Sequence, residues 1–530
     1  MTSEGSPAGL ESRNPATGEL VGAVVRCDAA ALEAAVGDAA SVQPAWAELR
    51  LSDRARYMRR AAQVTIDAMG ELAELIARES GRPRSEAAAA ELLPTVDALH
   101  WIADHGPRLL RDERVRPRQL YLLGKRHRHV RDPLGVVAIV SSPARPWLEP
   151  LIQAAVALMC GNGVVLNPAP ETPLVGERVA RALVRAGVPE GLIAVVHGGS
   201  EVAEALAATD GVEKVFLSGD GGTGRRVEAA CARRGKDAVL ELGGRDPQLV
   251  LADARLDEAV AGTLWGAFAG GGQPSGSIER IYVAEERFED YVEQLVAKAC
   301  ALRVGDPLDP VTELGPLLSP GRAEQVAALV DDALAEGAEL RCGGRASGGR
   351  LGPAFFAPTV LTGVTPETRI AREPVPGPVV TVSPVADEEE AIARANHSPW
   401  ALGASVWTRD RARGERVARR LDAGMVWVND HRYSYGAVES AWGGHGASGR
   451  GRVHGDPGFR ECVEIKLVAT DSGRVPRPWW PPYDASLGRA AEAGARILYG
   501  RDEQRWPALR SGARPLASTG LRALRAALRR

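Results

Sequence analysis

Apolar residues in the first part of the chain recur at helical spacing. Within residues 28–115 they return every three or four positions, as in AALEAAVGDAA and YMRRAAQVTIDAMGELAELIARES. This spacing gathers the apolar side chains on one face of a helix. The pattern therefore predicts a helical region over residues 28–115.

The pattern changes at Gly135 to short apolar runs separated by helical segments. The runs GVVAIV, GVVLN, IAVVHGG and KVFLSG are typical of buried strands, and AVALMC, VGERVARALVRAG and EVAEALAATD between them are typical of helices. Such alternation indicates a parallel sheet covered by helices on both faces. The runs VLELGG and PQLVLADA continue the series.

A second series of the same kind follows along the chain. Its predicted strands are RIYVAE, VTVSPV, GASVWT and GMVWVN, and its predicted helices include FEDYVEQLVAKACAL and RAEQVAALVDDALAEG. The chain is therefore predicted to be an α/β protein with two successive α/β domains, divided near residue 246.

Two polar segments fit neither predicted core. Residues 118–134 alternate in a way that is typical of an exposed hairpin. Residues 471–530 form a C-terminal extension that opens with the Pro-rich segment DSGRVPRPWWPPYD and ends with LRALRAALRR.

The extension leaves more than one interpretation open. Leu521, Leu524 and Leu528 would share one face of a short helix, which is either a frayed terminus or a weak contact with a membrane or a partner. Its aromatic residues would dock on the subunit's own surface or on a partner. These aromatic residues are Trp479, Trp480 and Tyr483.

Composition narrows the class of protein. A chain of 530 residues is expected to form two or three domains, and a formal net charge of −3 gives no general attraction to nucleic acid. The six cysteines lie in no CxxC pair, so no metal site is expected and a reducing compartment is indicated. The segment MTSEGSPAGLES has no signal-peptide pattern, and no apolar stretch is long enough to span a bilayer. We therefore expect a cytoplasmic protein.

Ten motifs in fixed order carry a family resemblance. They are NPATGE, GVVAIV, VVLNPAPETP, FLSGDGGTGR, LELGG, GGGQPSGSIER, PGPVV, ANHSPWALGASVWT, VND and GGHGASGRGR, between residues 14 and 452. Over roughly residues 10–470 the chain resembles the aldehyde dehydrogenase superfamily.

The resemblance implies an α/β fold with the domain plan of that superfamily. It implies a Rossmann-like cofactor-binding domain, a catalytic domain, and a β-arm for oligomerisation, followed here by the extension. The implied ranges are 10–117 with 135–245, then 246–440, then 118–134 with 457–470, and finally 471–530. A homo-oligomer, either dimer or tetramer, or a hetero-oligomer with an active paralogue would follow.

Of three positions that carry the family's chemistry, one keeps the family's residue and two have a different residue. The family attacks an aldehyde with a cysteine thiolate, stabilises the oxyanion with an asparagine amide, and activates water with a glutamate. The resemblance places Ser275 at the cysteine position and Ala144 at the asparagine position, whereas Glu241 keeps the base. Ser275 is either a filler residue or a substitute nucleophile, and Glu241 is either a base or a residue of a structural turn.

The positions that hold the family's cofactor are mostly altered. Asn167 replaces the ribose-binding lysine, Asp220 replaces the serine of the Gly-Ser pair that faces the pyrophosphate, and Pro374 replaces a ribose-binding glutamate. Asp220 would bind a cation or remain solvated. No tightly bound cofactor is expected from these changes, and NAD(P) if any. The cofactor positions taken together are Asn167, Pro170, Gly219, Asp220, Gly224, Leu242 and Pro374.

These replacements lead to a prediction about activity. Losing one oxyanion donor costs about 10²–10³ in rate, and a serine hydroxyl is far less acidic than a thiol. Whether the chain is an enzyme is left uncertain, and the leading expectation is an inactive relative that acts as a structural or regulatory partner. The alternatives are an NAD(P)-dependent aldehyde oxidoreductase, or a weak esterase or acyl transferase that uses Ser275 and Glu241.

Overall fold

The computed structural model divides the chain into two compact units, which are described separately. It describes residues 9–528 apart from residues 120, 121, 123, 346–350, 473–479, 482 and 484. The first unit comprises residues 1–110 and 133–464, and the second comprises residues 111–132 and 465–530.

The first unit contains a six-stranded sheet in the order β19-β9-β8-β5-β6-β7. All its neighbouring strands are parallel except β19, which runs antiparallel to β9. In the register, Ile139 lies between Leu166 and Phe216. The strands are β5 (Val136–Val140), β6 (Gly163–Asn167), β7 (Ile193–Val195), β8 (Val212–Gly219), β9 (Asp237–Leu242) and β19 (Gly449–Arg450).

Helices cover this sheet because its strands are apolar on both faces. Every residue of β5 and β6 is buried, as expected for parallel strands packed on both sides. The helices after the strands are α6 (Leu148–Cys160), α7 (Pro173–Arg185), α8 (Ser200–Ala208) and α9 (Gly221–Arg233). The elements that precede this sheet in the sequence are β1 (Gly9–Arg13), β2 (Leu20–Val25), α1 (Ala29–Ala47), α2 (Leu51–Asp67), α3 (Met69–Ser80), α4 (Arg84–Ala87) and α5 (Leu93–Leu109).

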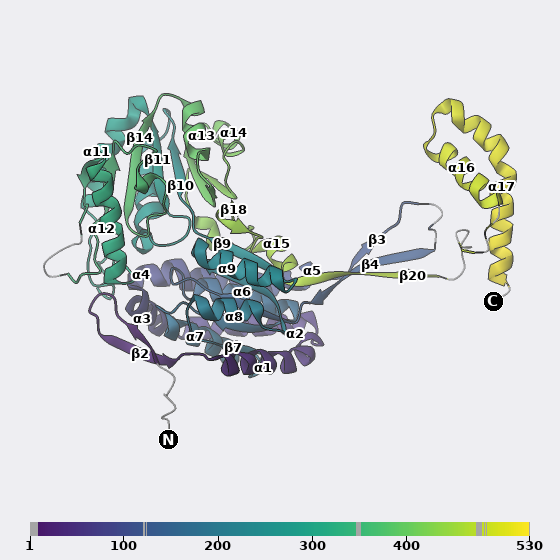
Figure 1. The fold of residues 1–530 in the computed structure, drawn as a ribbon, viewed down its shortest axis with the longest axis horizontal. Helices are drawn as coiled ribbons and strands as arrows, with labels where there is room; N and C mark the ends of the chain where they lie inside the picture. The colour runs from purple at the N-terminus through teal and green to yellow at the C-terminus, as the bar shows by residue number, and fades with distance from the viewer. Residues whose placement is uncertain are drawn as a thin grey trace, which may run out of the picture. The chain divides into compact units, whose positions relative to one another are not determined.

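A second sheet in the same unit has seven strands in the order β12-β13-β14-β11-β10-β16-β17. Its strands are β10 (Asp246–Val250), β11 (Ile278–Ala284), β12 (Glu339–Cys342), β13 (Thr359–Thr362), β14 (Val379–Val385), β16 (Gly403–Trp407) and β17 (Met425–Val428). Figure 1 shows α11 and α12 on one side of this sheet and α13 and α14 on the other. The helices are α10 (Leu256–Thr263), α11 (Phe288–Cys300), α12 (Pro320–Ala335), α13 (Glu388–Asn396) and α14 (Arg411–Ala418).

These two sheets confirm the predicted fold class, which is α/β.

Some smaller elements of the first unit lie after β14 in the sequence, and they include a two-stranded sheet formed by β15 and β18. They are β15 (Trp400–Ala401), β18 (His445–Gly446) and α15 (Gly455–Arg460).

The second unit is built on a three-stranded sheet in the order β20-β4-β3. Its strands are β3 (Glu113–Val115), β4 (Lys125–Pro133) and β20 (Val463–Asp471). The hairpin expected within 118–134 is instead formed by β4 with β3, which begins before that range. Residues 457–460, which were assigned to the arm, lie in α15 rather than in a strand.

The C-terminal extension is helical in the described residues. It forms α16 (Ala485–Tyr499) and α17 (Asp502–Leu528), which pack on each other. The backbone is helical to Leu528, whereas Trp479 and the side chains of residues 520–530 lie outside what the structure describes. Among the described residues, no helix is long and apolar enough to cross a membrane.

Candidate active site

The side chains of Ser275 and Glu241 lie close together, although one comes from a loop and the other from a strand far from it in the sequence. Glu241 lies in β9 of the six-stranded sheet, and Ser275 lies in the loop between α10 and β11. The Ser275 hydroxyl donates to Glu241 Oε1 at 3.2 Å. The loop that presents Ser275 requires glycine, because Gly272 has φ +67° and a Cβ there would lie 2.3 Å from the Gly377 carbonyl oxygen.

Burial controls the charge of the Glu241 carboxyl group. Glu241 is 3% exposed, and this burial raises its pKa, although the nearby Arg145 cation acts in the opposite direction. Burial and the charge of Glu241 raise the pKa of Glu149 to about 8. Glu149 is therefore mainly protonated at neutral pH, and Glu241 is the carboxyl group that faces Ser275. Its second oxygen, Oε2, is buried and has no hydrogen-bond partner among the described residues.

The oxyanion position keeps one donor instead of two. Ala144 has no side-chain donor, and its carbonyl oxygen accepts from Arg82. The backbone N–H of Ser275 donates no hydrogen bond within the described part of the chain. This N–H therefore remains available for an oxyanion on an atom bonded to the Ser275 oxygen.

A cavity of about 250 Å³ leads from Ser275 to the carboxyl ends of the strands of the six-stranded sheet. Glycines line much of it, which permits close approach of a ligand to the backbone. Gly224 contributes to packing rather than to the lining, because a Cβ there would lie 2.4 Å from Leu242 Cδ2. The lining includes Ser142, Ala144, Gly219, Asp220, Gly243, Gly244, Ser275, Arg322, Pro374 and Trp400.

Asp220 occupies the N-terminus of α9. Its Oδ1 accepts from the backbone N–H groups of Gly222 at 2.8 Å and Thr223 at 2.9 Å. Burial raises the pKa of Asp220, but hydrogen bonds from Thr223 and Gly222 outweigh burial and hold the pKa below its ordinary value. The helix N–H groups that favour a phosphate are therefore already bonded to a carboxylate.

The other altered cofactor positions offer little to a ribose. Asn167 is buried, and its side-chain amide donates to the carbonyl oxygens of Val196 at 3.0 Å and Gly198 at 3.2 Å. Pro170 and Pro374 have no polar side-chain atom to offer. The cleft therefore has room for a nicotinamide dinucleotide at its glycine-lined end and near Arg322. At Asp220, however, the cleft does not offer the contacts that the family makes with the pyrophosphate.

The sequence interpretation missed a second cavity on the other side of Ser275. This cavity of about 690 Å³ is lined by Arg82, Glu86, Arg145, Trp265, Arg432 and Tyr435, among others, and it shares Pro274 with the first. The Arg145 guanidinium lies over the Tyr435 ring at 4.1 Å and the Trp442 ring at 5.6 Å. The sequence signal that could have pointed to this cavity is Arg145, a charged residue directly after Ala144 and close to the start of an apolar helix.

Comparisons with known proteins agree with this geometry. A model of the aldehyde dehydrogenase family matches residues 1–468. A betaine aldehyde dehydrogenase of Cereibacter sphaeroides is 37% identical over 466 residues, which cover 88% of this chain and 94% of that protein. One of Rhizobium etli is 35% identical over 471 residues, covering 89% and 95%.

Solved structures give the same picture. An aldehyde dehydrogenase of Bacillus cereus, solved in complex with NAD⁺, superimposes with a TM-score of 0.83 at 30% identity and covers 88% of this chain and 93% of its own. An aldehyde dehydrogenase of Brucella melitensis biovar abortus superimposes with a TM-score of 0.83 at 31% identity, covering 88% and 94%.

These relatives correct two predictions. The prediction of an inactive structural or regulatory partner is wrong, because relatives named as betaine aldehyde dehydrogenases are similar over nearly the whole of their own length. The expectation that no cofactor binds tightly is not supported, since a similar structure holds NAD⁺.

Proposed function

The chain belongs to the aldehyde dehydrogenase family, and from this premise we propose that it oxidises an aldehyde to a carboxylic acid with Ser275 as the nucleophile and Glu241 as the base. The observation that supports the proposal is the hydrogen bond from the Ser275 hydroxyl to Glu241 Oε1 at 3.2 Å. A serine nucleophile needs an adjacent base, and burial makes the Glu241 carboxylate more basic than an exposed one.

The proposed chemistry proceeds through a covalent ester. The Ser275 oxygen adds to the aldehyde carbon while Glu241 takes the hydroxyl proton, and the backbone N–H of Ser275 stabilises the resulting oxyanion. NAD(P), when bound, supplies the hydride acceptor that leaves an acyl group on Ser275. After losing its first proton to solvent, Glu241 takes a proton from the water that attacks the ester. It then gives this proton to the Ser275 oxygen as the ester bond breaks and the acid leaves.

The residues of the first cavity would hold that cofactor in a modified way. Gly219, Gly243 and Gly244 leave room for it, and Arg322 supplies a cation whose side chain makes no hydrogen bond or ion pair within the described residues. Asp220 would oppose the pyrophosphate, so the proposal includes weaker nucleotide binding than in relatives with a serine there.

An assay of reduced nicotinamide formation tests this function. With an aldehyde and either NAD⁺ or NADP⁺ in excess, the wild-type chain should form reduced nicotinamide, and Ser275→Ala should remove the activity. Ser275→Cys should raise it, because a thiolate is the stronger nucleophile near neutral pH. Equal rates for wild type and Ser275→Ala would reject Ser275 as the nucleophile.

The second cavity, of about 690 Å³, is called the substrate-side cavity from here on, and its lining favours a substrate that carries no positive charge. A quaternary ammonium group, such as that of betaine aldehyde, is commonly held by faces of aromatic rings. Here the Arg145 guanidinium already lies over Tyr435, and the Arg432 guanidinium lies over the Trp265 ring at 5.4 Å. Two of the rings that line this cavity are therefore covered by cations, which repel a cationic substrate.

Arg145 supports an aldehyde that carries a carboxylate. Its side chain is buried and makes no hydrogen bond or ion pair with the rest of the described chain, so its N–H groups can bind an anion in the cavity. Succinic semialdehyde should have a higher kcat/KM than butanal, and betaine aldehyde should have the lowest. The Arg145→Gln variant should lose the preference for succinic semialdehyde over butanal, and a preference for betaine aldehyde in wild type would refute this substrate class.

Assembly into a homo-oligomer is also supported by an exposed strand. β20 lies at the edge of its sheet, and Ile465 and Leu467 on it are 53% and 55% exposed. Edge strands with exposed apolar side chains are typical sites of strand pairing. Light scattering should find an oligomer that Ile465→Glu with Leu467→Glu dissociates, whereas Leu20→Glu, at an equally exposed leucine of β2, should leave it intact.

A further inference from the structure

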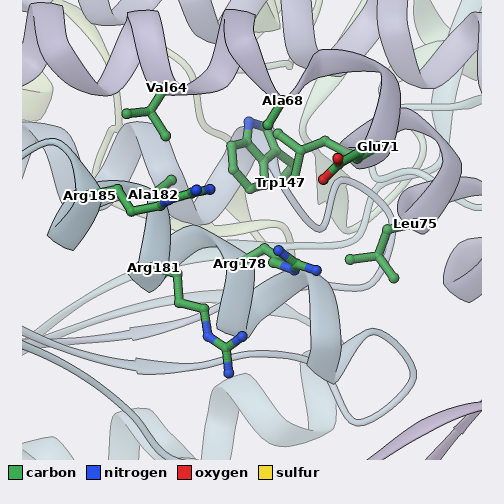
Figure 2. A pocket seen from close by; sticks show the side chains of 10 residues that line it. Val64, Ala68, Glu71, Leu75, Trp147, Arg178, Arg181, Ala182 and Arg185 are labelled. Carbon is green, nitrogen blue, oxygen red and sulfur yellow. The ribbon is translucent and has the colours of Figure 1, made fainter.

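A cavity outside the candidate active site combines cations with an apolar lining. It has a volume of about 330 Å³ and lies between α2, α3 and α7, on the helices that cover the six-stranded sheet. Figure 2 shows its side chains. They are Val64, Ala68, Glu71, Leu72, Leu75, Trp147, Arg178, Arg181, Ala182 and Arg185.

Three arginines of α7 give the cavity its charge. Arg178, Arg181 and Arg185 are spaced by three and four residues, which places them on one helical face. In Figure 2 the guanidinium group of Arg185 lies beside the Trp147 ring and that of Arg178 extends toward Leu75, whereas Arg181 extends away from both. Arg181 pairs with Glu177 at 3.9 Å, and Arg178 and Arg185 have no hydrogen bond or ion pair in the described chain.

The Trp147 indole forms a buried part of the wall of the same cavity. Trp147 is 0% exposed, and its Nε1 has no hydrogen-bond partner among the described residues. A buried N–H group without an acceptor is unusual and costs about 1–3 kcal/mol. Because this nitrogen has no exposed surface, a ligand in the cavity would contact the ring and would not reach the N–H group.

Apolar side chains continue from this cavity into a larger groove. The two spaces share Leu75, Arg178 and Arg181, and the groove has a volume of about 790 Å³. On its far side the groove is lined by Val21, Ala23, Val25 and Leu174, from β2 and α7. A ligand with a flexible apolar chain therefore fits the pair of spaces better than a small inorganic anion does.

We propose that this cavity binds an amphiphilic carboxylate. The carboxylate group accepts hydrogen bonds from Arg178 and Arg185, and its aliphatic chain lies along Leu75 toward the groove. Glu71 is the one carboxylate in the lining, and the two unpaired guanidinium groups leave a net positive charge beside it. The site is separate from Ser275 and does not depend on the function proposed above.

Calorimetric titration of the full chain with sodium octanoate tests the site. Wild type should bind octanoate, and the variant Arg178→Gln with Arg185→Gln should bind it about tenfold or more weakly. Arg181→Gln is the matched control, since it removes the arginine of the same face that points away, and it should change affinity by less than about twofold. Acetate lacks the tail and octylammonium has the opposite charge, so neither should bind measurably.

Several outcomes would overturn the proposal. Octanoate binding that is unchanged in the double variant, or that is weakened equally by Arg181→Gln, would show that these two arginines do not form the site. Because octanoate resembles a product of aldehyde oxidation, the Arg145→Gln variant is titrated as well. Loss of binding in that variant alone would place octanoate in the substrate-side cavity and refute the α7 site.

Discussion

The two ends of the cleft around Ser275 differ in what the sequence retains. At the chemical end, a hydroxyl and a buried carboxylate remain within hydrogen-bonding distance, and the cations of Arg145 and Arg432 surround the substrate side. At the nucleotide end, the packing of α9 on the sheet is retained, but Asp220 and Asn167 bond to their own backbone surroundings. Reacting groups and cofactor contacts can therefore diverge separately within one fold.

Removing the base should have the largest effect on this comparison. Glu241→Gln keeps the shape of the side chain but cannot accept a proton, so kcat should fall by about 10²–10⁴. Glu149→Gln is the matched control, because Glu149 is mainly protonated at neutral pH and an amide resembles its neutral form. The two rates are compared at saturating aldehyde and nucleotide, and equal losses in both variants would show that the pair acts through folding rather than through Glu241.

Changing the charge at the nucleotide end should have the next largest effect. Asp220→Ser keeps an N-cap for α9 and removes a carboxylate that faces the phosphates, so affinity for NAD⁺ should rise by about tenfold. Asp387→Ser is the control, because Asp387 is the N-cap of α13 in the other sheet's layer and should leave affinity unchanged. Equal nucleotide affinity in wild type and Asp220→Ser, measured by calorimetry, would contradict the proposed repulsion.

The pH dependence should report the charge of Glu241. A base acts in its deprotonated form, so activity is present above its pKa in the folded enzyme and is lost as pH falls through that pKa. Burial raises the pKa of Glu241 and Arg145 opposes the rise, so Arg145→Gln should move the acid limb of kcat/KM to higher pH. The profile is measured with butanal, which carries no charge, and a shift to lower pH would refute the assignment.

Sequence reasoning reached the fold and the pairing of Ser275 with Glu241 because both follow from local patterns. Strand runs and motif order depend on neighbouring residues, and motif positions place Ser275 opposite Glu241. An aspartate before a helix is a preferred N-cap, so the sequence could have predicted the cap at Asp220, where a bound cation or a solvated side chain was expected instead. The contact of Arg145 with Tyr435 could not be predicted, because it joins residues far apart in sequence, and burial and cation–π geometry arise only in the folded chain.

A substitution that disturbs the packing at the nucleotide end should have the smallest effect of those predicted here. Gly224 lies in α9, where alanine would normally favour the helix, but its Cβ would lie 2.4 Å from Leu242 Cδ2 at the end of β9. Gly224→Ala should therefore lower the free energy of unfolding by about 1 kcal/mol, because overpacking outweighs the gain in helix propensity. Gly37→Ala in α1, where no atom lies within 4 Å, should raise it by a similar amount. If denaturant unfolding showed both variants to be more stable, α9 would not be held closely on β9, and the retained glycine would instead serve ligand approach.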